Sequence, residues 1–162
     1  MGDPLQDVAE QFFATAGTRF VSPLTLVELC SVYSRIIHAI SIPAVTEVGG
    51  DIEKLEALVR ASLIDCSLSP VALPISAEWS LGNRKIRVPM EYAEARRLAG
   101  DLRLRTLDLL HVAYSSLLLK TGTPIEEFVT GDDELLSRSK RILELTEIRV
   151  VPPHKARPPR GA

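Results

Sequence analysis

The sequence has no apolar run that approaches the about 20 residues needed to cross a bilayer. Its first residues, Met1-Gly2-Asp3-Pro4, lack the basic start and apolar core of a signal peptide. There are only two cysteines, Cys30 and Cys66, and both lie in apolar stretches, which is not the pattern of a disulfide framework. We therefore expect a soluble protein of the reducing cytoplasm, with no membrane attachment.

Positive charge is not in excess either. The chain has 19 Lys and Arg against 21 Asp and Glu, for a formal net charge of -2. This balance excludes a protein that coats nucleic acid nonspecifically, so any nucleic-acid contact must be local. With 162 residues, 46% of them hydrophobic, the chain can bury one proper core but is short for two full domains. We expect one globular domain.

Helical and extended patterns alternate along the chain. Apolar periodicity predicts helices from Pro4, from Pro23 to about His38, over 52–64, over 89–98, over 106–120 and through a last stretch to about Leu143. Strands are predicted at 19–21, 71–75, 127–130 and 148–151, and an irregular, partly basic segment at 79–88. Ser22 and Asp51 are expected to cap helices, and Gly100 to end one. Such alternation is typical of a parallel sheet with helices on both faces.

Two aspartates occupy places where chemistry is common in α/β folds. Asp108 lies in the first turn of the most apolar helix, with His111 three residues on along the same face. Asp132 follows the strand at 127–130, and in open α/β sheets ligands bind outside the carboxyl ends of strands. Each also has a purely structural explanation, because Asp108 can complement the helix dipole and Asp132 can cap the helix that begins at Asp133.

A third acid, Glu28, lies at the edge of the apolar side of the helix from Pro23, where it is equally explained as a solvated residue. Read together, three blocks resemble the PIN domain family, and most of all the small prokaryotic VapC toxins. The blocks are Val21-Ser22-Pro23-Leu24-Thr25-Leu26-Val27-Glu28-Leu29, Leu104-Arg105-Thr106-Leu107-Asp108-Leu109-Leu110-His111-Val112-Ala113, and Phe128-Val129-Thr130-Gly131-Asp132. The resemblance covers about residues 4 to 152.

The resemblance implies a three-layer fold, with a central parallel sheet flanked by helices, and a cytoplasmic endoribonuclease. It implies that Glu28, Asp108 and Asp132 hold Mg²⁺ or Mn²⁺, that Thr130 positions a carboxylate or a water molecule, and that Asp133 is an extra acid. It further implies an RNA substrate, a VapB-like antitoxin as partner, and a homodimer. Hard divalent cations prefer carboxylate oxygens, and neighbouring carboxylates repel one another unless a cation offsets their charge.

Basic residues flank the expected site. Four arginines, Arg96, Arg97, Arg103 and Arg105, come just before the Asp108 helix and are candidate RNA-binding residues, since an arginine can contact a phosphate through two hydrogen bonds. A solvated helix face explains them equally well. The tail at 153–162 is rich in proline and basic residues, and we expect it to be disordered.

One feature of the family has no match. PIN domains begin with an apolar strand that ends in an aspartate and occupies the middle of the sheet, whereas Asp3 and Asp7 follow nothing extended. We expect residues 1–152 to be an N-terminally incomplete PIN-like domain, with Met1 an internal or misassigned start. The alternatives are a degenerate PIN-like module that binds RNA or protein without cleaving, and an unrelated α/β interaction domain whose acids are caps and surface charges.

Overall fold

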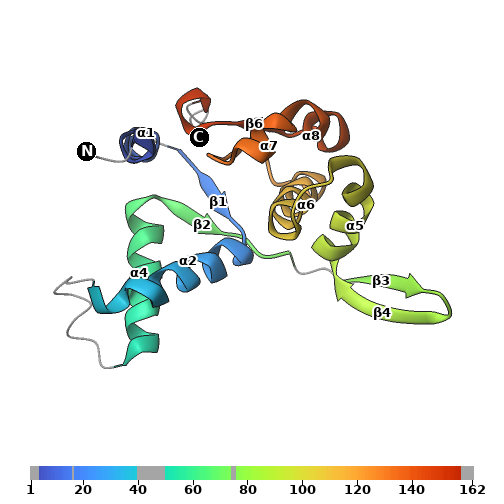
Figure 1. Cartoon of the computed structure of the whole chain (residues 1–162), viewed down its shortest axis with the longest axis horizontal. Helices are drawn as coiled ribbons and strands as arrows, with labels where there is room; N and C mark the ends of the chain where they lie inside the picture. The colour runs from blue at the N-terminus through green and yellow to red at the C-terminus, as the bar shows by residue number, and fades with distance from the viewer. Residues whose placement is uncertain (1–3, 16, 40–49, 74–75, 158–162) are drawn as a thin grey trace. The chain divides into compact units, whose positions relative to one another are not determined.

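A computed structural model of the chain describes residues 4–15, 17–39, 50–73 and 76–157 (Figure 1). These residues form two compact units. Unit 1 takes in residues up to Phe12 and Leu73–Arg157, and unit 2 takes in Phe13–Ala72. The first helix, α1 (Pro4–Ala14), contains the boundary between them and begins where the proline predicted it. No helix in the described ranges has the length and apolar character needed to cross a membrane.

The described part of unit 2 contains a parallel strand pair, two α-helices and a short 3₁₀ helix. Strand β1 (Arg19–Val21) pairs in parallel with β2 (Leu68–Pro70). Between them lie helix α2 (Pro23–Ile36), the short 3₁₀ helix η1 (Ile37–Ala39) and helix α4 (Asp51–Asp65). The Ser22 hydroxyl accepts a hydrogen bond from the Thr25 amide at 3.1 Å, which confirms the predicted cap of α2.

Among the described residues of unit 2, Ile37 and Leu58 are the buried apolar residues, and Tyr33, Leu55 and Ala57 pack against them. The Tyr33 hydroxyl also hydrogen-bonds the Ser62 hydroxyl, which ties α2 to α4. Gly50, not Asp51, is the N-cap of α4; Asp51 is the first helical residue instead, where its negative charge still favours the helix dipole.

Unit 1 is built around the apolar helix α6 (Thr106–Lys120), which the sequence predicted with the same bounds. It packs against α5 (Met90–Leu102), and the shorter helices α7 (Asp133–Ser137) and α8 (Ser139–Thr146) complete the cluster. The buried core joins these helices to a strand through Ala95, Leu98, Leu102, Leu109, Val112, Ala113, Leu135, Ile142 and Val150. Strand β5 (Glu127–Val129) pairs in parallel with β6 (Arg149–Val151).

Helix α5 differs from its prediction at both ends. Pro89 is the N-cap rather than the first helical residue, and Gly100 lies inside the helix instead of ending it. The helix ends two residues later, where Arg103 adopts a left-handed conformation with φ of 51°. The apolar periodicity explains the difference, because Leu102 is fully buried and holds the last turn in place past the glycine.

The segment predicted to be irregular, 79–88, is in fact an antiparallel hairpin of β3 (Ser76–Leu81) and β4 (Arg84–Pro89) (Figure 1). Gly82 has a φ of 61°, as the first position of a type II′ hairpin turn requires. The strand predicted at 71–75 is also wrong: pairing with β1 begins at Leu68, directly after the left-handed Ser67 turns the chain out of α4. Pro74 and Ile75 lie outside the described residues.

The predicted α/β class is confirmed at the level of its elements, since the described residues contain many helices, two parallel strand pairs and one antiparallel pair. The last helical stretch is divided, with Arg138 ending α7 before α8 begins. The basic tail is described to Arg157 only: Pro153–Lys155 forms the 3₁₀ helix η2, and the Arg157 amide donates to Glu127 Oε2 at 2.9 Å.

Candidate functional site

Asp108 lies in the first turn of α6, as the sequence predicted. Arg105 is the N-cap residue of this helix, and its side chain makes no capping hydrogen bond to the helix amides. The Arg105 guanidinium instead donates from Nε to Asp108 Oδ2 at 3.0 Å. The Asp108 side chain is 18% exposed and the Arg105 side chain 67% exposed, so the arginine end of this ion pair faces solvent.

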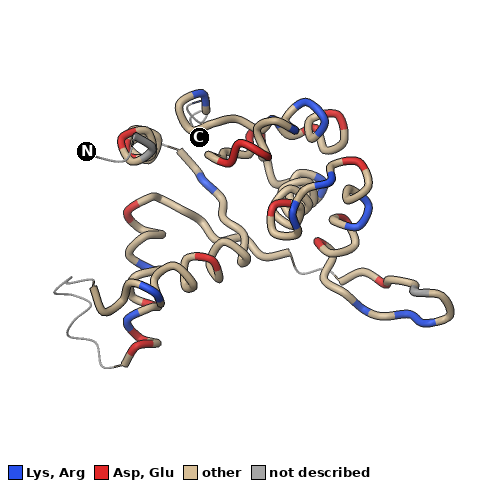
Figure 2. Tube along the Cα trace, viewed as in Figure 1, with Lys and Arg blue, Asp and Glu red and all other residues tan. Residues whose placement is uncertain are grey.

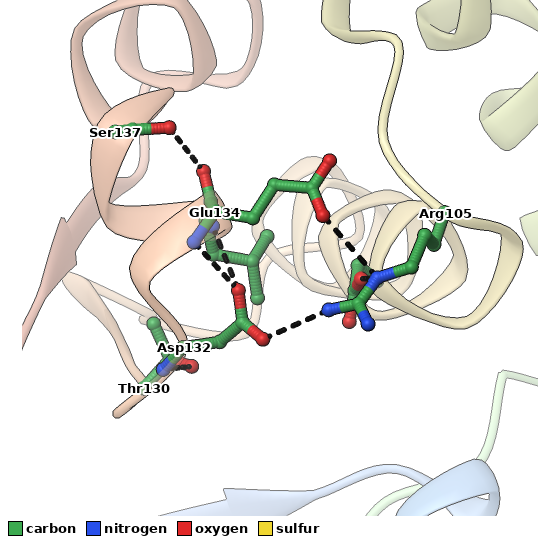
Figure 3. A network of polar contacts seen from close by, with 7 residues as sticks. Arg105, Thr130, Asp132, Glu134 and Ser137 are labelled. Atoms are coloured by element: carbon green, nitrogen blue, oxygen red, sulfur yellow. Dashed lines mark hydrogen bonds and ion pairs between the residues drawn. The ribbon is translucent and has the colours of Figure 1, made fainter.

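Asp132 is placed by the end of β5 and the start of α7. Its Oδ1 accepts from the amides of Glu134 at 2.8 Å and Leu135 at 3.1 Å, which makes it the N-cap of α7. The Thr130 hydroxyl accepts from the Asp132 amide at 3.1 Å, so Thr130 orients the backbone that carries the carboxylate (Figure 3). The capping explanation of Asp132 is therefore correct, yet it uses only one of the two carboxylate oxygens.

The second oxygen of Asp132 points to the same guanidinium that holds Asp108. Arg105 Nη2 donates to Asp132 Oδ2 at 3.0 Å, and Arg105 Nε lies 3.2 Å from Glu134 Oε2 (Figure 3). Unit 1 thus brings together Asp108 and Asp132, 24 positions apart in sequence, around one arginine. Three carboxylates face a single positive charge, so the cluster keeps a net charge of -2.

The protonation of the cluster follows from these contacts. The amide of Leu135 hydrogen-bonds the Asp132 carboxylate and is the main cause that holds its pKa below the usual value, with the Glu134 amide and Arg105 acting in the same direction. The nearby Asp108 is the main cause that raises the pKa of Arg105, with Asp132 and Glu134 adding to it. Arg105 and Asp132 are therefore both charged at neutral pH.

Glu28 and Asp133 are the other two predicted acids. Glu28 is on α2, in unit 2, where its side chain is half-buried. Asp133 is the first residue of α7 and is exposed. Within unit 1, the carboxylates that meet at Arg105 are those of Asp108, Asp132 and Glu134.

The four candidate arginines have different surroundings. Arg97 donates two hydrogen bonds to Glu94, at 2.9 and 2.7 Å, and Arg105 holds the carboxylate cluster. The guanidinium of Arg96 lies 4.9 Å from the centre of the Trp79 ring. Arg103 is the exposed, left-handed C-cap of α5.

Sequence reasoning missed Glu94, which is 8% exposed. Besides Arg97, it accepts from the Ser116 hydroxyl at 2.9 Å and the Lys120 ammonium at 2.6 Å, so it links α5 to α6. The hydrogen bonds from Arg97 are the largest cause that lowers its pKa to about 2, against the effect of burial. The signal was present: Glu94 is one position from Ala95 and four from Leu98, on the buried side of the helix.

The donor chemistry of the cluster suits a hard divalent cation, because carboxylate oxygens are the ligands that Mg²⁺ and Mn²⁺ prefer. In the structure the carboxylates of Asp108 and Asp132 are held by the Arg105 guanidinium. Within the described ranges no group of three acidic, histidine or cysteine side chains is arranged to hold a metal ion. A divalent cation at Asp108 and Asp132 would therefore have to compete with the Arg105 guanidinium.

Comparisons of this chain with protein-family models, with curated proteins and with solved structures find no match.

Proposed function

We propose that this protein is a metal-dependent endoribonuclease of the PIN type, acting as the toxin of a toxin–antitoxin pair. One observation supports it most: Asp108 at a helix start and Asp132 at a strand end, predicted as partners from separate sequence blocks, both contact Arg105. Two carboxylates from distant parts of the chain meet at one cation-holding position, which is the arrangement that the proposed chemistry needs.

In this proposal Asp108 and Asp132 hold Mg²⁺ or Mn²⁺, and the PIN resemblance adds Glu28 as a third ligand. When bound, the metal ion would lower the pKa of a water molecule and offset charge on the RNA phosphodiester. Thr130 fixes the backbone of Asp132, and the α7 amides hold Oδ1, so that Oδ2 is aimed in one direction. This preorganisation is the contribution of the chain's own residues.

The wider features of the proposal rest on the PIN resemblance. They are the three-layer fold with one central parallel sheet, the VapB-like antitoxin, the homodimer and the cytoplasmic location. The parallel pairing within each unit supports the three-layer fold. Among the described residues no strand matches the apolar one that precedes the first aspartate in the family.

A second candidate function is a PIN-like module that binds RNA or protein without cleaving it. Arg105 favours this alternative, because the guanidinium already offsets part of the carboxylate charge that a metal ion would offset. The two candidates differ in whether Mn²⁺ can replace Arg105 at the cluster.

Cleavage of a fluorescent RNA with and without Mn²⁺ separates the two. If the protein is a nuclease, Mn²⁺ supports cleavage, and Asp108→Asn or Asp132→Asn lowers its rate by about a hundredfold or more, as is usual when an electrostatic contact at a reacting centre is removed. Asp101→Asn is the matched control, since Asp101 also pairs with an arginine, Arg141, on the same unit. Cleavage that is equal in all three variants would exclude the site.

Binding of Mn²⁺, measured by calorimetry, tests the role of Arg105. Arg105→Gln should raise the affinity for Mn²⁺, because it removes a competing positive charge from the two carboxylates. Arg141→Gln removes a guanidinium that pairs with two other carboxylates, those of Asp101 and Glu144, and it should leave Mn²⁺ affinity unchanged. If Arg105→Gln binds Mn²⁺ no better than the unmodified protein, Arg105 does not occupy the metal position.

A further inference from the structure

The β3–β4 hairpin of unit 1 has two different faces. Strand geometry places alternate residues on opposite faces, so the pairs Trp79↔Ile86 and Ala77↔Val88 share one face, and Glu78↔Arg87 and Ser80↔Lys85 share the other. The first face contacts α5, where Arg96 lies over the Trp79 ring at 4.9 Å. The second face is exposed along both strands.

The exposed part of the hairpin is basic. Arg84, Lys85 and Arg87 fall within four consecutive positions of β4, and Glu78 is the one acid of the two strands (Figure 2). Lys85 pairs with Glu78 at 2.7 Å. Within the described part of the chain, no carboxylate lies within ion-pair distance of Arg84 or Arg87. Glu78 is also the direct cross-strand partner of Arg87, and with three cations against this one acid the two strands carry a net charge of +2.

Phosphate groups suit this surface better than isolated carboxylates do. An arginine fork matches a phosphate through two parallel hydrogen bonds, and a ladder of strand residues presents successive forks in a fixed order along one line. Lys85 and Arg87, two positions apart on one face, stand about 6.7 Å apart by strand geometry. Arg84 pairs with Leu81 beside the turn and lies on the other face of the hairpin, so a polyanion that follows Lys85 and Arg87 has to bend around the hairpin tip to contact Arg84 as well.

We propose that Arg84, Lys85 and Arg87 form an arm that binds the phosphodiester backbone of single-stranded RNA. The arm follows from the hairpin itself, and only the choice of RNA over DNA rests on the proposed function. Because the chain has a net charge of -2, any nucleic-acid contact must be made by a local basic surface, and the hairpin is such a surface. The stacking of Arg96 on Trp79 anchors the arm to α5, so the cations are presented by a fixed element.

Anisotropy of a short labelled single-stranded RNA, titrated with the full chain in EDTA at several salt concentrations, tests the arm without cleavage. The double variant Arg84→Gln, Arg87→Gln should bind about tenfold more weakly. It should also reduce the slope of log affinity against log salt by about 1.4, since each lost phosphate contact accounts for about 0.7 on a single strand. Arg84→Lys with Arg87→Lys keeps both charges and should retain most of the slope.

The matched control is Arg138→Gln with Lys140→Gln, two exposed basic residues of unit 1 outside the hairpin. This control should bind RNA as the unmodified protein does. Unchanged binding by the hairpin variant, or an equal loss in the control, would refute the arm. Hairpin-dependent binding of duplex DNA or polyglutamate in place of the RNA would also refute it, in favour of another partner. RNA binding that depends on the hairpin, in a protein that never cleaves RNA, would keep the arm and reject the nuclease.

Discussion

Asp132 has two tasks, one for each carboxylate oxygen. Oδ1 caps α7 and Oδ2 meets Arg105. Asparagine keeps an oxygen that can cap the helix, whereas alanine keeps none. We predict that Asp132→Asn leaves the thermal unfolding midpoint almost unchanged and that Asp132→Ala lowers it by about 2–4 °C, the shift usual for one lost cap in a chain of this size. Circular dichroism melts of both variants measure this, and an equal shift in the two would mean that the cap is not stabilising.

The buried Glu94 carboxylate predicts a pH-dependent stability. Its pKa is about 2 in the folded protein and 4.5 as the ordinary value, so folding favours the charged form. The stabilisation is fully present above about pH 4.5 and is lost as the pH falls toward 2. Glu94→Gln should lower the free energy of unfolding by about 3 kcal/mol at pH 7 and by about half as much at pH 3.

Urea unfolding at both pH values measures the effect. Glu144→Gln is the control, because Glu144 pairs with Arg141 on the surface at 3.0 Å and is 47% exposed. Exposed pairs of this kind contribute little to stability. If the Glu94→Gln deficit is the same at pH 3 as at pH 7, the carboxylate charge is not its cause.

At the scale of elements, two glycines should respond in opposite ways to alanine. Gly100 lies inside α5, and a Cβ there would meet no atom within 4 Å, so Gly100→Ala should raise the free energy of unfolding by about 0.5 kcal/mol. Gly82 has equal space around it but a φ of 61°, so Gly82→Ala should lower the free energy of unfolding by about 1 kcal/mol through backbone strain. Urea unfolding of the pair checks both signs; a stabilising Gly82→Ala would contradict the hairpin turn.

How far the sequence predicts these elements depends on what holds each one. The bounds of α6 were predicted correctly because the segment is apolar nearly all round, so it had to be a buried helix over its whole length. The hairpin was missed because three basic residues in four positions hide the alternation of Trp79, Ile86 and Val88, and a Gly-Asn turn is a weaker signal than Asn-Gly. The helix end predicted at Gly100 was wrong because the burial of Leu102 outweighs the low helix propensity of a single glycine.

The candidate site was predictable only in part, for the same kind of reason. Asp108 and Asp132 were found from their places in the helix and strand pattern. Arg105 was predicted as an RNA-binding candidate, and its contact with Asp132 could not be read from the sequence, because 27 positions separate them and only tertiary packing joins them. Glu134 was missed because a helix-starting acid is usually a dipole effect alone.

At the scale of the whole molecule, the two units have unequal cores. Over the parts of the chain that the structure describes, nine buried apolar residues form the main cluster of unit 1, against Ile37 and Leu58 in unit 2. Local opening is easier where less apolar surface is buried. We predict that the amides of α5 and α6 exchange hydrogen much more slowly than those of α2 and α4. Hydrogen exchange followed by mass spectrometry measures this, and equal protection in both units would show that they open together.

Because its two carboxylate oxygens have different roles, Asp132 is also restricted in the substitutions that it can accept during evolution. Loss of Oδ1 removes the cap of α7, whereas loss of Oδ2 removes the ion pair with Arg105. A change at position 132 to a residue that cannot cap therefore lowers the stability of the fold by about 1 kcal/mol and removes the charge at the same time. Asparagine, serine and threonine each keep a capping oxygen without the negative charge, so a lineage that gave up the carboxylate charge and kept α7 would be expected to carry one of these residues at position 132.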